Sequence, residues 1–160
     1  MSGLLLRLAR VLLVALGCAQ AHAASVCTVT ALPVAFGNYN PQAIAANTST
    51  GSVTVVCQPV VASATQIYTL RMSTGSSANY AQRTMLAGAN NLNYQLYSDA
   101  GYTQVWGNGS GASSTVSGSL PLSVLVPVSA THTVYGRLPA AQTQAGAGSY
   151  LDTITVTVTY

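Results

Sequence analysis

The most regular hydrophobic pattern in this chain lies at its C-terminal end. Four apolar side chains occupy every second position there, each preceded by a threonine: Ile154, Val156, Val158 and Tyr160. Successive residues of a β-strand point to opposite faces of a sheet. The pattern therefore predicts a strand with one face on the core and the other face in water.

Similar alternation, rich in β-branched and aromatic residues, recurs along the rest of the chain. The stretches are 27–36, 52–58, 66–73, 92–98, 120–128 and 132–138. Segments rich in Gly, Asn, Ser and Pro lie between them, at 37–50, 74–79, 88–91 and 107–119. About seven short strands joined by such turns predict an all-β sandwich or barrel, with little room for helices.

Two prolines modify one of these predicted strands. Pro121 and Pro127 both fall within the stretch 120–128. Because proline has no N–H to donate to a strand ladder, we expect this strand to lie at an edge, to be bulged, or to be interrupted.

Composition indicates a folded domain and excludes one class of function. The 160 residues suit a single domain, and 49% of them are apolar although only 4% are charged. There is no Lys and no Glu, and three arginines beyond residue 24 are widely spaced: Arg71, Arg83 and Arg137. They form no basic patch, so nucleic-acid binding through phosphate contacts is not expected. Each arginine is expected to bind a loop carbonyl or an aspartate.

The first 24 residues read as a secretory signal peptide. Arg7 and Arg10 supply a positive start, residues 11–17 are apolar, and Ala21-His22-Ala23 fits the small-x-small cleavage rule. We therefore expect cleavage after Ala23 or Ala24, which assigns residues 1–24 to the signal peptide and residues 25–160 to one domain with no transmembrane segment. The alternative is cleavage before Cys18, which would then carry a lipid.

Two cysteines remain after this cleavage, Cys27 and Cys57. Because disulfides persist in exported proteins, we expect the two to pair. Closing a loop of about 30 residues should stabilise the fold by roughly 3–4 kcal/mol. The alternative is a pair of buried free thiols. No spacing of Cys and His supports a metal site.

Candidates for catalysis are few. The exported chain has one histidine, His132, and two carboxylates, Asp99 and Asp152. A Ser-His-Asp triad needs these residue types, but no nucleophile motif accompanies them. We expect His132 and Asp152 to be exposed at the starts of strands and Asp99 to stabilise a turn. The sequence thus predicts no enzyme, no catalytic residue and no cofactor.

Aromatic residues suggest packing rather than ligand binding. Trp106, the single tryptophan, could stack on a ligand, but between Val105 and Gly107 it is better explained as a core or rim residue. Four tyrosines are interpreted as sandwich residues whose hydroxyls reach an edge or solvent: Tyr94, Tyr135, Tyr150 and Tyr160.

Several segments in fixed order carry a family resemblance. They are 27–29 with 34–39, 51–57, 83–85 with 92–99, 105–107, 134–139, and the closing 147–160. On these segments the chain resembles the spore coat protein U domain family, which is similar to archaic chaperone–usher pilins. The resemblance covers residues 27–160. It rests on the order and spacing of the segments together.

The resemblance implies an immunoglobulin-like β-sandwich of about six or seven strands that builds a surface fibre or coat. In the pilin relatives the fold lacks its last strand, and an apolar groove is filled first by a periplasmic chaperone and later by a neighbouring subunit. The implied partners are such a chaperone, an outer-membrane usher and neighbouring subunits. The implied route is secretion through the periplasm to the cell surface or medium.

The expected site of strand complementation is the last strand, through Ile154, Val156, Val158 and Tyr160. After the predicted cleavage only Ala24, Ser25 and Val26 precede Cys27. We therefore expect a subunit that accepts a strand but has little to donate, as a terminal subunit would. The alternative is a self-contained spore or cell-surface coat protein that does not polymerise by strand donation.

Overall fold

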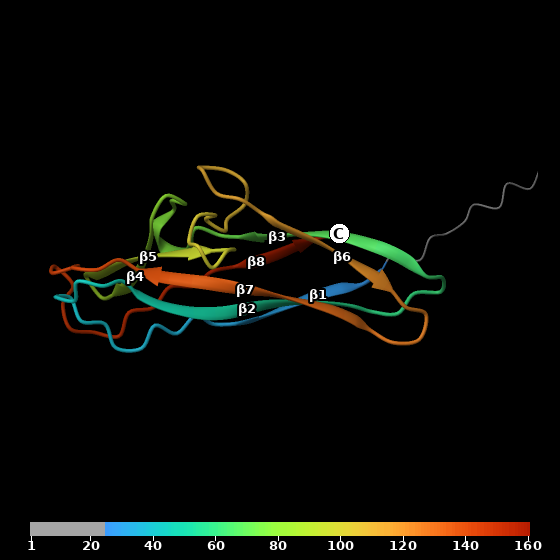
Figure 1. Ribbon diagram of the computed structural model, residues 1–160, viewed down its shortest axis with the longest axis horizontal. Helices are drawn as coiled ribbons and strands as arrows, with labels where there is room; N and C mark the ends of the chain where they lie inside the picture. The colour runs from blue at the N-terminus through green and yellow to red at the C-terminus, as the bar shows by residue number, and fades with distance from the viewer. Residues whose placement is uncertain (1–24) are drawn as a thin grey trace, which may run out of the picture.

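The computed structural model describes residues 25–160, which form eight antiparallel β-strands and one 3-10 turn, η1 (Gly75–Ser77). The strands are β1 (Cys27–Leu32), β2 (Asn47–Cys57), β3 (Ala64–Met72), β4 (Arg83–Ala87), β5 (Asn90–Tyr97), β6 (Val116–Leu122), β7 (Val128–Leu138) and β8 (Val156–Thr159). They make two sheets, ordered β1-β2-β7-β5-β4 and β6-β3-β8 (Figure 1). The predicted all-β sandwich is confirmed. The predicted signal peptide, 1–24, and its rival lipid site at Cys18 lie outside the described residues.

One strand was not expected from the hydrophobic pattern. β4 has only five residues and no strict alternation, yet it pairs with β5 from Arg83↔Tyr94 to Ala87↔Asn90. Gly88, with φ +61°, allows the tight turn between them. The pairing partner, rather than local periodicity, makes this segment a strand.

The central pair of the larger sheet is β2 and β7, which pair over 11 residues from Asn47↔Leu138 to Cys57↔Val128. Inward side chains of β2 are buried at every second position, at Val53, Val55 and Cys57. This alternation is the period-two pattern that the sequence predicts for a strand with one wet face.

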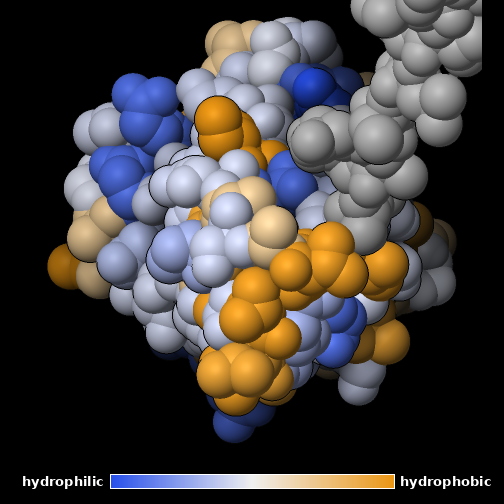
Figure 2. All heavy atoms as spheres, turned by 90° about the vertical axis from the view of Figure 1, so that its right-hand side faces the viewer, coloured by the Kyte–Doolittle hydropathy of each residue, from blue (hydrophilic) through white to orange (hydrophobic). Residues whose placement is uncertain are grey.

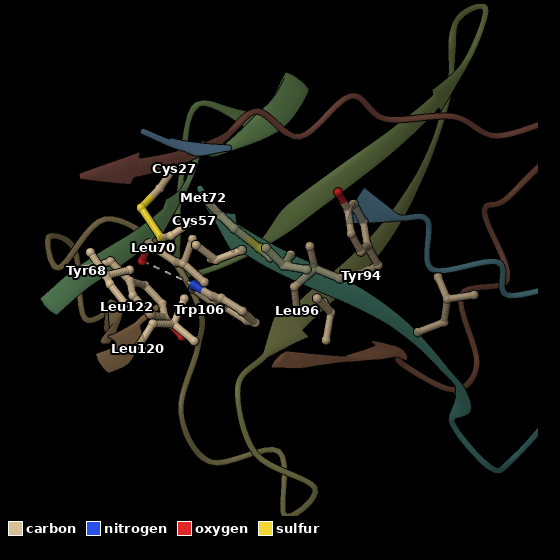
Figure 3. Close-up of a cluster of buried hydrophobic side chains, with 14 of the residues drawn as sticks. Cys27, Cys57, Tyr68, Leu70, Met72, Tyr94, Leu96, Trp106, Leu120 and Leu122 are labelled. Carbon is tan, nitrogen blue, oxygen red and sulfur yellow. Dashed lines mark hydrogen bonds between the residues drawn. A yellow bond between two sulfur atoms is a disulfide. The ribbon is translucent and has the colours of Figure 1, made fainter. Parts of the chain in front are cut away.

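The core fills the space between the sheets and is drawn in Figure 3. Trp106 is fully buried in it, and its indole Nε1 donates a hydrogen bond of 3.4 Å to the Leu70 carbonyl. Trp106 is therefore a core residue, and it has no face free to stack on a ligand.

A disulfide joins Cys27 to Cys57, which lie directly opposite each other on β1 and β2. Both residues are buried. The bond fastens the start of the edge strand β1 to the end of the neighbouring strand β2.

The prolines behave as predicted for an edge. β6 is an edge strand of the smaller sheet and contains Pro121. The predicted strand 120–128 is interrupted, because β6 ends at Leu122 and β7 begins at Val128. Pro127 lies in the loop between them.

β8 forms one edge of the smaller sheet and pairs only with β3, from Met72↔Val156 to Thr69↔Thr159. Ile154, Val156 and Val158 pack against the core, whereas Thr157 and Thr159 are exposed. The regular strand is shorter than the predicted alternating stretch. Within residues 25–160 we find no helix with the length and hydrophobicity needed to span a bilayer.

Candidate functional site

An apolar groove opens between the free edges of the two sheets. Its first part is a cleft of about 340 Å³ whose walls are residues 31–36 and 150–156. Core side chains form its floor: Val53, Met72, Met85, Tyr94, Leu96 and Val134. The hydrophobic core is thus reached directly through this cleft.

A second cleft, of about 740 Å³, continues the first. Its walls are residues 33–41 and 145–151, and it shares Val34, Phe36 and Met85 with the first cleft. Together the two clefts make one long groove, with one of these two chain segments along each side. We call it the edge groove.

Two glycines position the first wall. A Cβ at Gly51 would lie 2.9 Å from Val34 Cγ2, and a Cβ at Gly136 would lie 2.5 Å from Val34 Cγ1 and 2.8 Å from Phe36 Cζ. Only glycine therefore lets this wall lie so close to β2 and β7. The side chains of Ser49 and Asn47 hold its backbone, donating hydrogen bonds of 2.7 Å to the Ala35 carbonyl and 3.0 Å to the Phe36 carbonyl.

Asp152 anchors the second wall. Its Oδ2 accepts a hydrogen bond of 2.6 Å from the Tyr94 hydroxyl. Its Oδ1 accepts bonds from the Ser76 amide at 2.9 Å and the Ser76 hydroxyl at 2.8 Å. One residue earlier, Leu151 exchanges backbone hydrogen bonds with Leu86 of β4. Asp152 therefore ties the segment before β8 to both β5 and the η1 loop.

Alternate backbone groups along β8 and the residues just before it point away from β3. Thr155 accepts a hydrogen bond from the Ser73 amide, so the N–H and C=O groups of Thr155, Thr157 and Thr159 face β3. Because these groups alternate along a strand, those of Ile154, Val156 and Val158 face away from β3. This side of β8 is a free edge.

β1 presents the opposite free edge. Val26 accepts a hydrogen bond from the Gln58 amide, which places Val26, Thr28, Thr30 and Leu32 on the side of β2. The backbone groups of Val29 and Ala31 therefore point away from β2, and Ala31 lines the edge groove. A chain lying between β1 and β8 would meet hydrogen-bonding groups on both sides.

Of the four residues predicted for strand complementation, two line the edge groove and two do not. Ile154 and Val156 line the edge groove. Val158 pairs with Leu70 and packs on the core, and Tyr160 follows β8 with its side chain about half exposed. The groove also includes residues that sequence reasoning did not assign, chiefly in 33–41 and 145–151. In the sequence these two segments stand out only by their content of turn-forming residues, which does not predict a groove wall.

A buried cation lies behind the second wall. Arg83 is fully buried and donates hydrogen bonds to Gln95 Oε1 at 2.6 Å, the Ser73 carbonyl at 2.9 Å and the Trp106 carbonyl at 2.7 Å. Burial lowers the pKa of Arg83, and Asp152 is among the groups that raise it. Burial also raises the pKa of Tyr94, as does its hydrogen bond to Asp152. The prediction that arginines bind loop carbonyls holds for Arg83, but its complete burial was not foreseen.

The predicted catalytic candidates have separate partners. Contrary to prediction, His132 lies inside β7 rather than at a strand start, and its Nε2 is 2.7 Å from the Tyr68 hydroxyl. Burial lowers the pKa of His132. Asp99 accepts backbone hydrogen bonds from Gln104 and Thr103 that lower its pKa, as expected of a turn residue. Among residues 25–160 no three His, Cys, Asp or Glu side chains are grouped so that they could hold a metal ion.

Known proteins resemble this chain in sequence and in fold. The model of the Spore Coat Protein U domain family matches residues 13–157. No curated protein matches the chain.

Solved structures also match, among them the CsuC–CsuE chaperone–tip adhesion subunit pre-assembly complex from archaic chaperone–usher Csu pili of Acinetobacter baumannii. That match has 21% identity and a TM-score of 0.54, and covers 86% of this chain and 40% of the other. A chaperone–tip adhesin complex of CFA/I fimbriae matches with 14% identity and a TM-score of 0.44, over 82% of this chain and 42% of that one. The chain thus spans about two-fifths of these solved chains. The Csu match shows a shared fold.

Proposed function

Because the chain belongs to the Spore Coat Protein U domain family, we propose that it is an exported structural subunit of a surface fibre or coat whose edge groove accepts a β-strand from a partner chain. The observation that carries this proposal is the groove itself, open to the core and bordered by the free edges of β1 and β8. A free strand edge beside an apolar groove is a docking site for an added strand.

The geometry supports a specific mode of binding. Backbone groups of Val29 and Ala31 on one side, and of Ile154 and Val156 on the other, would bond the incoming strand. Every second side chain of that strand would enter the groove and contact Val53, Met72 and Leu96 on its floor. The preferred partner segment is therefore extended, with apolar residues at alternate positions.

The rim of the groove favours an occupied state. Leu32 and Leu151 line the groove and are mostly exposed to water. Covering such side chains stabilises a complex by about 25 cal/mol for each Å² of apolar surface removed from water. An unoccupied subunit should therefore be prone to association, and a chaperone that supplies a strand would protect it.

The assembly route follows from the same proposal. Residues 1–24 would direct export and be removed, leaving residues 25–160 as one domain. The solved relative with the same fold is a chaperone–subunit complex of an archaic chaperone–usher pilus. By analogy, the partners would be a periplasmic chaperone, an outer-membrane usher and neighbouring subunits, and the function would be structural and adhesive rather than enzymatic.

A self-contained coat protein is the second candidate. One observation favours it: β1 and β8 already contact each other along part of the gap between the sheets. If these edges stay together, the groove is only an indentation of a closed sandwich. The two candidates differ in whether an added strand binds.

The experiment is a melting curve of the exported protein with and without a synthetic strand of about ten residues with alternating apolar positions. Strand binding should raise the melting temperature in proportion to the logarithm of peptide concentration. A peptide of identical composition with clustered apolar residues is the control. An equal response to both peptides, or no response to either, would favour the self-contained coat protein.

A matched pair of variants locates the binding site. Val156→Thr places a hydroxyl at the groove with almost no change in shape, whereas Thr157→Val changes the water-exposed face of the same strand. We expect Val156→Thr to weaken peptide binding and Thr157→Val to leave it unchanged. The reverse order would place the peptide elsewhere.

A further inference from the structure

One end of the sandwich exposes a cluster of aliphatic side chains. Figure 2 shows them gathered on the face that looks out from the right-hand side of Figure 1. They are Val26, Val61, Val124, Leu125 and Val126, with exposed fractions of 56%, 85%, 47%, 82% and 57%. We call these five residues the apolar end. The largest contiguous apolar patch on a protein surface, typically a few hundred Å², is often functional.

Backbone hydrogen bonds hold the segments of the apolar end together. The Gln58 amide donates to the Val26 carbonyl at 2.9 Å, and the Val60 amide donates to the Ser123 carbonyl at 3.0 Å. These bonds join the chain before β1, the β2–β3 loop and the β6–β7 loop. The Cys27–Cys57 disulfide lies at the base of the cluster. The side chains are therefore presented on a connected base rather than on independent loops.

The β6–β7 loop also satisfies two of its own amides. Ser123 Oγ accepts hydrogen bonds from the Leu125 amide at 3.1 Å and the Val126 amide at 3.4 Å. Pro59 and Pro127, in the two loops, have no N–H group at all. In a hydrocarbon phase an unbonded amide is strongly unfavourable. These loops can therefore leave water with less penalty than ordinary surface loops.

Charge argues for an electrically neutral partner. The segments 58–64 and 121–131 contain no Asp, Glu, Lys, Arg or His. A surface that recognised an anionic lipid, nucleic acid or charged protein would carry complementary charge. The apolar end therefore offers its partner hydrophobic contacts and no complementary charge.

The size of the cluster argues against a stable interface with another copy of the chain. A Val or Leu side chain carries about 100 Å² of apolar surface, and these five are 47–85% exposed, so together they offer on the order of 300 Å². A standard protein interface buries about 800 Å² on each partner. A few projecting side chains can instead enter a soft apolar phase, which needs no matching shape.

We propose that the apolar end inserts Val124, Leu125 and Val126, together with Val61, into the hydrocarbon of an uncharged lipid surface. Insertion removes these side chains from water, as it does for the apolar face of an interfacial anchor. This role is independent of strand acceptance, because the edge groove is built from other residues, 31–41 and 145–156.

The test is flotation of the protein, purified as exported by its producing cells, with vesicles of phosphatidylcholine. The native protein should float with the vesicles. Leu125→Ser combined with Val126→Ser should lower the partition coefficient by about tenfold or more, because two inserted side chains become polar. Both residues are exposed, so the melting temperature should not change.

The matched control is Ile44→Ser combined with Ile67→Ser. These isoleucines are also exposed, at 98% and 69%, but belong to the β1–β2 loop and to β3. This variant should float like the native protein. The proposal is wrong if the native protein does not float, if the control loses as much binding as the test variant, or if both keep it.

Two further measurements separate other partners. Flotation that requires phosphatidylglycerol and disappears in high salt would show charge-driven binding and overturn the proposal. Sedimentation without lipid should be identical for the native protein and the Leu125→Ser/Val126→Ser variant. Loss of self-association in that variant would assign the apolar end to a second copy of the chain instead.

Discussion

The Tyr94 hydroxyl donates a hydrogen bond of 2.6 Å to Asp152 Oδ2, and this bond connects the two sheets across the floor of the edge groove. Tyr94 belongs to β5 in the larger sheet, and Asp152 lies in the segment that leads into β8 in the smaller one. The bond joins a buried phenol to a carboxylate that also holds the η1 loop. It should therefore matter for both stability and groove shape.

Replacing Tyr94 with Phe should destabilise the fold by about 1.5–3 kcal/mol, the range for a hydrogen bond to a charged group. Chemical denaturation of the purified protein measures this loss. Tyr160→Phe is the control, since that side chain is about half exposed and should change stability little. An unchanged midpoint for Tyr94→Phe would mean that Asp152 is held by its other hydrogen bonds.

The Cys27–Cys57 disulfide should contribute roughly 3–4 kcal/mol through the loop that it closes. The size of this stabilisation follows from the 30 residues that separate the two cysteines in the sequence. Reductant should therefore lower the melting temperature of the native protein. The double variant Cys27→Ser/Cys57→Ser should melt at that lower temperature and be insensitive to reductant. A native protein that melts equally with and without reductant would contradict a stabilising role.

Stability should fall in mildly acidic solution because of His132. Burial lowers the pKa of His132 in the folded protein, so the unfolded chain binds the proton more readily. Its contribution is complete above about pH 6.5, the unfolded value, and is lost as pH falls through the lower folded pKa. The titratable group in contact with it is the Tyr68 hydroxyl.

The variant His132→Gln should remove this acid dependence, which begins as the pH falls below about 6.5. The lowered pKa of Asp99 acts in a separate and more acidic window, below the ordinary aspartate value. Denaturation midpoints measured across this pH range distinguish the two residues. A pH profile that His132→Gln leaves unchanged would assign the dependence elsewhere.

Gly136→Ala should disturb the edge groove. The added Cβ would collide with Val34 and Phe36, so it should cost about 1–3 kcal/mol and weaken strand binding. Gly37→Ala is an informative comparison, because that site has open space but a φ of +67°. It should cost about 1 kcal/mol from backbone strain alone while strand binding persists. Equal effects of both variants on binding would contradict the assigned wall.

The strand pattern was largely predictable because period-two alternation is local. Ile154, Val156 and Val158 contact the core as their spacing predicts, and Pro121 lies on an edge strand. The pairing of Cys27 with Cys57 needed only the count of cysteines left after the predicted cleavage. β4 was missed because it lacks strict alternation and becomes a strand only through its pairing with β5. His132 was misplaced because β7 begins four residues earlier, where Ser and Ala hide the alternation.

The amino-acid sequence by itself determined the all-β class, which face of the alternating strands is apolar, and the disulfide. These features depend on neighbours in the chain and on composition. Only the tertiary structure decided where the free edges meet, why Arg83 is buried, and which loops form the apolar end. Those features join residues far apart in sequence, such as Val60 with Ser123 and Tyr94 with Asp152. No local pattern encodes such contacts, since they arise when the two sheets pack and bring distant segments into reach.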